Sequence, residues 1–354
     1  MHDLIEPMIR SSTRRRFLAA GGAAFRGLAT GPAWARVLEE EAGPMIKRYR
    51  TLGRTGFEVS DISMGCGRIA DSDVVRYAYD NGVNLFDTAE SYGNGDSEKK
   101  IGEAMEHMER EKIFIVTKLD IEGDPDRQNL VERFNKSLER LQSPYADALY
   151  AHGIADVDLL EYKPFLEDCD QLKQEGKLKH IGISSHGPRG DEPDAMDTVL
   201  IKAAESGHYD VMLLSYGFLN AEEGERVLKA CKDKNIGTTI MKSATGLMEM
   251  PVYDPENPSE QVQEWFEYLE GQGSTREEAE ERIKSYLERE HDNFAEAVAG
   301  SRAFIEKYGI ETQDELELKS FQWVLGNPDA HTICPSMPTF DALDRLLPLS
   351  GTQL

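Results

Sequence analysis

Residues 84–102 read NLFDTAESYGNGDSEKKIG, and this stretch decides the fold. A short apolar run ends at Asp87, Tyr92 follows five residues later, and Gly93 and Gly95 precede a charged segment with helical spacing. The pattern predicts a buried strand, a glycine-containing loop and a helix. It also places an acid at the end of the strand and a phenol in the loop beyond it.

The same alternation of strand and helix runs through the chain from residue 49 onward. Helical patterns are clear at 73–82 and 129–142, and at 159–176, where Pro164 predicts a separate first turn. Eight apolar runs alternate with such segments, at 59–65, 83–88, 112–118, 147–152, 178–185, 209–216, 237–243 and 331–337. Alternation of this kind predicts parallel strands, and eight units match an α/β (β/α)8 TIM barrel of about 250 residues.

The alternative to a barrel is an open, doubly wound sheet. Such a sheet would carry G-x-G-x-x-G after its first strand, and GCGRIAD at 65–71 lacks the third glycine. We therefore favour the barrel, and we expect its polar working residues at the carboxyl ends of the strands.

Residues 1–35 differ from the rest of the chain. SSTRRRFLAAGGAAF (11–25) places arginines before a small, mildly apolar run, and AWA follows at 33–35. This is the layout of an export signal, and 13–18 resembles a twin-arginine motif. The resemblance implies export of the folded protein by the twin-arginine machinery to the periplasm, or a cytoplasmic protein if the signal is unused. A disordered basic tail is the alternative.

We divide the remaining chain into a linker at 36–48 and a barrel at 49–349. A charged segment at about 247–312, which contains EEAEERIKSYLEREHDNFAEAV (277–298), interrupts the barrel after the seventh strand. It predicts inserted helices that act either as a lid or specificity element or as a solvated decoration.

Composition excludes several classes of protein. A net charge of −25 argues against binding to nucleic acid and disfavours binding to anionic membrane surfaces. The apolar stretch near the N-terminus is too short and too interrupted for a stable membrane span. The four cysteines show no metal-binding spacing, which favours buried, reduced thiols. Cys66 and Cys334, at the ends of the first and last strands, leave a disulfide open as a minor alternative.

Three adjacent strand ends carry a group of polar side chains. Asp87 and Tyr92 follow the second strand, Lys118 ends the third and His152 ends the fourth. Taken singly, Asp87 would be a turn or capping residue, Lys118 a solvated lysine at a strand end and His152 a histidine of the core. Together they form an acid, a phenol, an amine and an imidazole that converge at one end of the barrel.

This group resembles the active site of the aldo-keto reductase family. FDTA-x-x-Y-G is followed in the family's order by KSLERLQ (136–142), EGKLKHIGIS (175–184) and FQWVLGNP (321–328), so the resemblance covers about 49–349. It implies hydride transfer between a nicotinamide dinucleotide and a carbonyl or alcohol substrate, without a metal. Tyr92 would be the general acid/base, because a nearby Lys118 ammonium lowers the pKa of a phenol from about 10. Asp87 would hold Lys118, and His152 would orient the carbonyl oxygen.

The resemblance also implies a cofactor site across the barrel mouth. Tyr216 would stack on the nicotinamide and Ser184 would contact its carboxamide. The other implied contacts are Gly67 and Arg68 after the first strand, Ser185 after the fifth, Lys242 and Ser243 after the seventh, and Ser336 and Met337 after the eighth.

Several of these positions depart from the family pattern. Leu213 replaces a glutamine, Ser185 replaces an asparagine, and Ser336 with Met337 replaces a Lys-Ser pair. Ala342 stands where NADP-preferring members have an arginine, and Arg345 is a possible substitute one turn later. The cofactor is therefore predicted as NADP or NAD, with the preference open.

Two classes of function remain. The complete tetrad favours an NAD(P)-linked carbonyl oxidoreductase. The altered cofactor positions and the acidic insertion leave a nucleotide-sensing regulatory protein as the alternative. A weaker alternative is a barrel that uses another cofactor or that holds a non-exchanging dinucleotide. The substrate, the direction of the reaction and the oligomeric state do not follow from the sequence.

Overall fold

The computed structural model describes residues 45–121, 129–187, 194–244, 253–271 and 273–354. They form two compact units, a barrel unit within 41–244 and 310–354 and a helical unit within 245–309. The export signal predicted at 1–35 and most of the predicted linker at 36–48 lie outside the described residues.

The barrel unit contains eight strands that pair in parallel and in sequence order. They are β3 (Met64–Gly65), β4 (Leu85–Asp87), β5 (Phe114–Leu119), β6 (Ala146–Ala151), β7 (Leu178–Ser185), β8 (Val211–Ser215), β9 (Gly237–Met241) and β10 (Thr332–Ile333). Parallel bridges between Ile62 and Ile333 and between Gly65 and Ser336 join the two edges. The Ser63 amide donates to the Ile333 carbonyl at 2.8 Å. The predicted closed barrel is confirmed.

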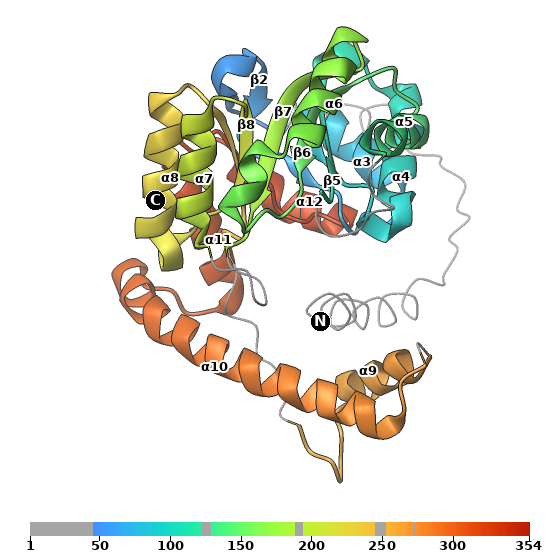
Figure 1. The fold of residues 1–354 in the computed structure, drawn as a ribbon. Helices are drawn as coiled ribbons and strands as arrows, with labels where there is room; N and C mark the ends of the chain where they lie inside the picture. The colour runs from blue at the N-terminus through green and yellow to red at the C-terminus, as the bar shows by residue number, and fades with distance from the viewer. Residues whose placement is uncertain (1–44, 122–128, 188–193, 245–252, 272) are drawn as a thin grey trace, which may run out of the picture. The chain divides into compact units, whose positions relative to one another are not determined.

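Helices surround the strands (Figure 1). They are α3 (Ser72–Asp80), α4 (Asp96–Ala104), α5 (Leu130–Leu141), α6 (Lys163–Gln174), α7 (Met196–Ser206), α8 (Ala221–Asp233), α11 (Gln313–Leu325) and α12 (Phe340–Leu346). Short 3-10 helices are η2 (Gly53–Thr55), η3 (Tyr92–Gly95), η4 (Met105–His107), η5 (Arg110–Lys112), η7 (Val157–Glu161), η8 (Phe218–Asn220) and η9 (Leu347–Leu349).

Local sequence signals account for where these helices begin. The Asp71 carboxylate caps α3 by accepting from the Val74 amide, and the Asn129 side chain caps α5 by accepting from the Glu132 amide. Pro164 stands in the first turn of α6 and separates it from η7, as predicted.

An antiparallel hairpin precedes the barrel, and the sequence analysis missed it. Strands β1 (Tyr49–Thr51) and β2 (Glu58–Ser60) pair around η2. Residues 59 and 60, which were predicted to begin the first barrel strand, belong to this hairpin. Leu52 and Val59 are fully buried in the same cluster as Leu85 and Phe114 of the barrel strands, so the hairpin contributes to the interior packing.

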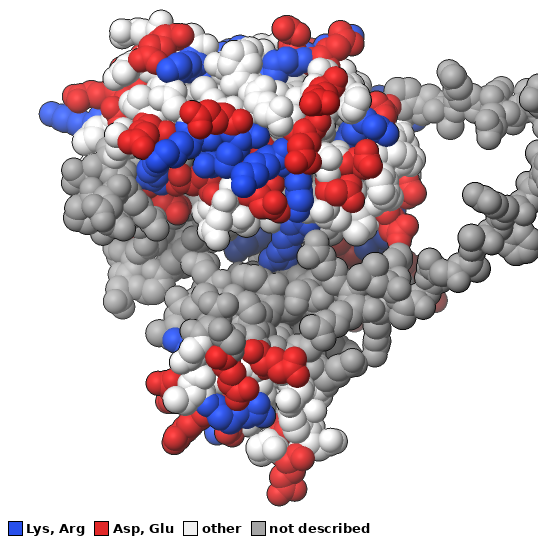
Figure 2. Space-filling view, turned by 90° about the vertical axis from the view of Figure 1, so that its right-hand side faces the viewer, with Lys and Arg blue, Asp and Glu red and all other residues white. Residues whose placement is uncertain are grey.

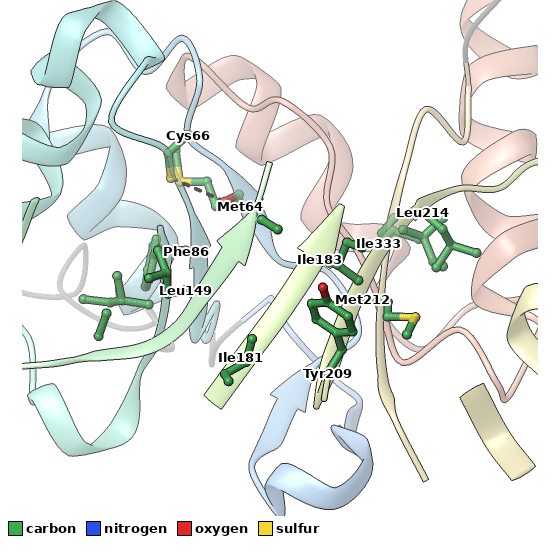
Figure 3. Packing of buried hydrophobic residues seen from close by; sticks show 14 of the residues in the cluster. Met64, Cys66, Phe86, Leu149, Ile181, Ile183, Tyr209, Met212, Leu214 and Ile333 are labelled. Atoms are coloured by element: carbon green, nitrogen blue, oxygen red, sulfur yellow. Dashed lines mark hydrogen bonds between the residues drawn. The ribbon is translucent and has the colours of Figure 1, made fainter. Parts of the chain in front are cut away.

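The barrel wall separates two hydrophobic cores. The inner core includes Val116, Tyr150 and Leu213. The outer core lies between strands and helices, and Figure 3 shows it spread over strands around the barrel. Because side chains alternate along a strand, strands such as β4, β5, β6 and β8 contribute to both cores. This explains the nearly continuous apolar runs that marked the strands in the sequence.

The helical unit has a hydrophobic core of its own. Helices α9 (Glu260–Gly271) and α10 (Arg276–Tyr308) follow β9, as the sequence predicted for the charged insertion. Thr275 and Glu278 form a capping box at the start of α10. Trp265 and Tyr286 pack edge to face with ring centroids 5.7 Å apart. This core packs the two helices against each other.

The surface of the described residues is charged, with both signs present. On the face shown in Figure 2, lysine and arginine side chains are bordered by aspartate and glutamate. Within the described ranges, no helix is both long enough and apolar enough to span a bilayer.

Candidate active site

The four residues of the predicted tetrad lie together at the carboxyl ends of adjacent strands. Asp87 is the last residue of β4, Lys118 lies near the end of β5 and His152 directly follows β6. Tyr92 begins η3 in the loop after β4. Parallel pairing of these strands brings residues that are far apart in sequence to one edge of the barrel.

A turn of unusual backbone conformation follows Tyr92. Gly93, Asn94 and Gly95 have φ values of 59°, 54° and 86°, and glycine and asparagine tolerate this left-handed region best. A Cβ at Gly95 would come within 2.5 Å of the Arg140 side chain, so a larger residue has no room there. The glycines noted in the sequence therefore let the chain turn immediately after the tyrosine and begin α4.

The Lys118 ammonium is the centre of the site, and its side chain is fully buried. Its Nζ donates to Asp87 Oδ1 at 2.5 Å and to the Thr88 carbonyl at 2.7 Å, and lies 3.5 Å from the Tyr92 hydroxyl. Three oxygens thus surround one buried charge, and Asp87 neutralises it. This is the contact set that the sequence analysis expected for these three residues.

The electrostatics differ in one respect from that expectation. Burial raises the pKa of the Tyr92 phenol above its usual value, and this outweighs the opposing effect of Lys118. For Lys118, burial lowers the pKa of the ammonium, but the charges of Asp87 and Tyr92 more than compensate and raise it. Both groups therefore hold their protons at neutral pH, and Tyr92 is set as a proton donor.

The His152 ring lies beside the phenol. The rings of Tyr92 and His152 are 5.9 Å apart at an interplanar angle of 77°. His152 Nδ1 lies 3.1 Å from Asp120 Oδ1. The sequence analysis missed Asp120, and its position two residues after Lys118 was the available signal. The phenol, ammonium and imidazole can serve one carbonyl or hydroxyl oxygen together.

Four residues of the predicted cofactor set, Gly67, Ser184, Lys242 and Ser243, lie at or just beyond the ends of barrel strands. Gly67 lies beside the Tyr92 ring, since an added Cβ would stand 3.6 Å from it, in ordinary van der Waals contact. Ser184 is buried and accepts from the Gly153 amide at 2.8 Å. Lys242 is exposed at the end of β9, and the adjacent Ser243 hydroxyl is buried without a hydrogen-bond partner. A cation beside an unsatisfied hydroxyl fits a phosphate-containing ligand.

Tyr216 does not lie where the resemblance placed it. Its side chain is 1% exposed, belongs to the outer core and packs against Trp323 of α11 with ring centroids 5.2 Å apart. Its hydroxyl accepts from Asn327 Nδ2 at 2.9 Å. The prediction that this ring stacks on a nicotinamide is corrected, because the ring is covered by the helices outside the barrel wall.

The remaining residues of the predicted cofactor set differ in how exposed their side chains are. Ser185 is buried and accepts from the Gly187 amide at 3.3 Å. Arg68 is half-buried and Ser336 is exposed, and Ser336 pairs through its backbone with Gly65. Met337 is fully buried in the outer core, so its side chain does not face a ligand, and this prediction too is corrected.

Arg345 is engaged elsewhere. Its guanidinium forms an ion pair with Glu317 and lies 3.5 Å from Asp314, and both of these carboxylates are on α11. The arginine that was considered a substitute phosphate ligand is therefore already neutralised by two acids.

The cysteines are free thiols. Cys66 packs in the outer core and Cys334 against the inner core, and the two thiols are near enough for Cys334 to contribute to the raised pKa of Cys66. Both are free in this structure, which does not support the minor disulfide alternative. Within the described part of the chain, histidine, cysteine and carboxylate side chains form no cluster that could hold a metal ion.

Fold and site together define a (β/α)8 barrel with a carbonyl-handling tetrad of acid, phenol, amine and imidazole. The model of the aldo/keto reductase family matches residues 68–313, and the chain belongs to that family. It is 31% identical to L-galactose dehydrogenase of Arabidopsis thaliana over 59% of this chain and 70% of that protein. It is 29% identical to the aldo-keto reductase YhdN of Bacillus subtilis over 55% of this chain and 61% of that protein.

Solved structures agree on the fold. An aldo-keto reductase of Bacillus halodurans in its holo form superposes with a TM-score of 0.59 at 19% identity, covering 87% of this chain and 92% of that one. An aldo/keto reductase of Klebsiella pneumoniae in complex with NADP and acetate gives a TM-score of 0.55 at 18% identity, covering 87% of this chain and 92% of that one. The alignment with YhdN, like that with an aldo-keto reductase of Glycine max at 56%, spans less than two thirds of the relative's length.

Proposed function

We propose that this protein is an NAD(P)-linked oxidoreductase that interconverts a carbonyl compound and the corresponding alcohol. The observation that carries the proposal is the Lys118 ammonium, which lies 2.5 Å from Asp87 and 3.5 Å from the Tyr92 hydroxyl. A buried, neutralised ammonium beside a protonated phenol is suited to delivering one proton to an oxygen atom.

A bound nicotinamide dinucleotide would supply the hydride. In this proposal Lys242 and Ser243 would hold its phosphates, and Ser184 at the end of β7 would contact its carboxamide. In reduction, the Tyr92 O–H donates its proton to the substrate oxygen, and the Lys118 ammonium stabilises the phenolate that remains. His152 positions that oxygen. In oxidation, the same proton returns to Tyr92.

The cofactor preference is proposed to favour NAD over NADP, or to accept both. Ala342 removes the arginine that the family resemblance predicts for a 2′-phosphate, and Arg345 is paired with Glu317 and Asp314. These acids would repel a phosphate brought to that end of the site. The NADP-bound relative shows that the fold accepts the phosphorylated cofactor, without fixing the preference of this chain.

The regulatory alternative loses support because the four tetrad residues lie together with their charges paired. A protein that only senses a nucleotide has no need for a buried ammonium beside a phenol. We also propose that the helical unit, with α9 and α10, helps to select the class of substrate.

Replacement of Tyr92 by phenylalanine tests the proposal. We expect loss of carbonyl reduction by a factor of about 100 or more, with NADH and NADPH affinities unchanged in a fluorescence titration. Tyr77→Phe is the matched control, because it removes a phenol that lies on α3 and bonds to Asp344. Turnover by Tyr92→Phe equal to that of the unmodified protein would contradict the proposal.

We also propose export through the twin-arginine motif at 13–18, with a periplasmic location for the mature protein. The motif in the sequence is the support. Replacement of Arg14 and Arg15 by lysine is expected to retain the protein in the cytoplasm, as measured by cell fractionation. Equal periplasmic yield from the doubly substituted chain would exclude this route.

A further inference from the structure

Asp120 and His152 occupy neighbouring positions at the ends of two paired strands. Leu119 and Ala151 are the last register partners of β5 and β6, and Asp120 and His152 follow them directly. The His152 amide donates to the Leu119 carbonyl at 3.0 Å, which continues the pairing beyond the strands. The closeness of the two side chains is therefore built into the register of the sheet.

The main chain at Asp120 is held from outside the barrel. Arg133 of α5 donates from Nη1 to the Asp120 carbonyl oxygen at 3.1 Å, and it also forms an ion pair with Glu90 in the loop after β4. The Arg133 and Glu90 side chains are 15% and 20% exposed, so this arrangement is partly shielded from water. Asp120 is thus fixed by its strand and by a neighbouring helix.

The carboxylate of Asp120 faces one particular atom of the histidine. Oδ1 lies 3.1 Å from Nδ1, a charge contact in which Nδ1 does not yet complete a hydrogen bond in this structure. An ionised carboxylate only accepts hydrogen bonds, so it favours a proton on Nδ1. If the ring carried its proton only on Nε2, the lone pair of Nδ1 would face the lone pairs of the Asp120 carboxylate, and the two would repel each other. The arrangement therefore leaves Nε2 for the substrate oxygen.

We propose that Asp120 is a positioning residue for His152. Its carboxylate beside Nδ1 favours a proton on that nitrogen, limits rotation of the ring and leaves Nε2 to face the substrate oxygen. This proposal rests on the proposed oxidoreductase function for its catalytic meaning. A neutral ring held in this way presents an acceptor, which suits the hydroxyl of an alcohol. A protonated ring presents a donor, which suits a carbonyl oxygen. In both states Asp120 holds the same edge of the ring.

The first test reads the proton directly and needs no turnover. Nitrogen NMR of protein labelled with 15N-histidine distinguishes a protonated Nδ1 from a protonated Nε2, and His152→Ala identifies the signal among the eight histidines of the chain. We expect a protonated Nδ1 in the unmodified protein and a shift of the proton toward Nε2 in Asp120→Ala. The same tautomer in both proteins would overturn the proposal.

The second test is kinetic. Asp120→Ala is expected to lower kcat roughly 10- to 100-fold, the size of a lost charge-assisted hydrogen bond, with dinucleotide affinity retained. Asp120→Asn should recover part of the loss, because an amide oxygen still accepts from Nδ1–H. In a His152→Ala background, Asp120→Ala should cost nothing further. An equal loss in that background would show that Asp120 acts through another group and would overturn the proposal.

Asp158→Asn provides the matched control. It removes an exposed carboxylate in the loop after β6 and leaves the Asp120–His152 pair in place, so kcat and the His152 tautomer should remain unchanged. A loss equal to that of Asp120→Ala would assign the effect to a general loss of negative charge instead. If no carbonyl compound is turned over by the unmodified protein, the oxidoreductase proposal fails, and the NMR result still decides the role of Asp120.

Discussion

The ring of Tyr150 lies directly across Gly182 on the neighbouring strand. A Cβ at Gly182 would stand 2.2 Å from the ring carbons Cδ1 and Cε1. The two residues are register partners in β6 and β7, and Lys118 is the partner of Tyr150 on the other side. The glycine therefore makes room for a large interior side chain in the same row of the barrel as the buried ammonium.

Gly182→Ala is expected to destabilise the barrel. The added methyl group has to displace the Tyr150 ring, and overpacking of this kind costs about 1–3 kcal/mol. Urea unfolding at neutral pH measures the change. In a Tyr150→Leu background the same substitution should cost much less, because the ring that clashes is gone. An equal loss of stability on Gly182→Ala in both backgrounds would show that the added methyl group clashes with a group other than the Tyr150 ring.

Lys118→Met is expected to abolish reduction and to destabilise the fold at the same time. The substitution leaves Asp87 as a buried charge without its partner, which costs about 3–5 kcal/mol. The double variant with Asp87→Asn should restore much of the stability without restoring turnover. Measurement of kcat and of thermal unfolding on the two variants separates the roles, and recovery of activity in the double variant would rule out a catalytic role for the ammonium.

Carbonyl reduction is expected to persist to high pH. Tyr92 must be protonated to donate, and its pKa is raised above the usual value of about 10. Activity should therefore be retained from neutral pH upward and lost only as the pH rises through the pKa of Tyr92. Alcohol oxidation should increase over the same interval. A basic limb of the kcat profile near neutral pH would contradict this assignment.

Acid sensitivity of the fold is expected to depend on His331. Burial, together with the nearby Arg50, lowers the pKa of this imidazole to about 4, and its Nδ1 accepts from the Thr238 amide at 3.1 Å. The unfolded chain takes up a proton near pH 6.5, whereas the folded chain does so only near pH 4. Stability is therefore full above pH 6.5 and declines as the pH falls, by about 2 kcal/mol at pH 5.

Urea unfolding at pH 7 and at pH 5 checks this prediction. His331→Asn should be less stable than the unmodified protein at pH 7 and should show a smaller drop between the two pH values. His208, which is exposed on the barrel unit, is the matched control position. An unchanged pH dependence in His331→Asn would assign the acid sensitivity to other groups.

The acids beside Arg345 are expected to influence the choice of dinucleotide. Glu317→Gln together with Asp314→Asn frees the guanidinium and removes two negative charges. Affinity for NADPH relative to NADH should then rise by about tenfold, which is the effect of one recovered charge contact. Asp341→Asn, an exposed acid on α12, is the control, and equal gains for both dinucleotides would point to a general charge effect.

The pattern of the sequence was enough to predict the barrel. Apolar runs that alternate with helical periodicity gave eight strands in parallel order, because a strand buried on both faces has few polar positions. The hairpin at 49–60 was missed, since its second strand runs directly into the first barrel strand without a turn signal between them. Residues 59 and 60 carry the same apolar pattern in either element.

The tetrad was visible in the sequence because each member lies at the end of a recognisable strand or in the loop just after it. Tyr216 follows a strand too, and its environment was mispredicted. The sequence specifies that an aromatic residue stands there, whereas the face of the wall on which its ring lies depends on α11, about 100 residues later. Asp120 was missed for a related reason, since its partner is on another strand.

The sequence by itself determined the order of strands and helices, the residue types at the strand ends and the family to which they belong. These are local properties, fixed by periodicity, by glycine positions and by short motifs. Only the tertiary structure decided that the Tyr216 ring lies in the outer core, that Arg345 is already paired, and that Asp120 lies beside His152. Each of these depends on the register between strands or on contacts between distant helices, and side-chain contacts across a closed barrel leave no periodic signal in the chain.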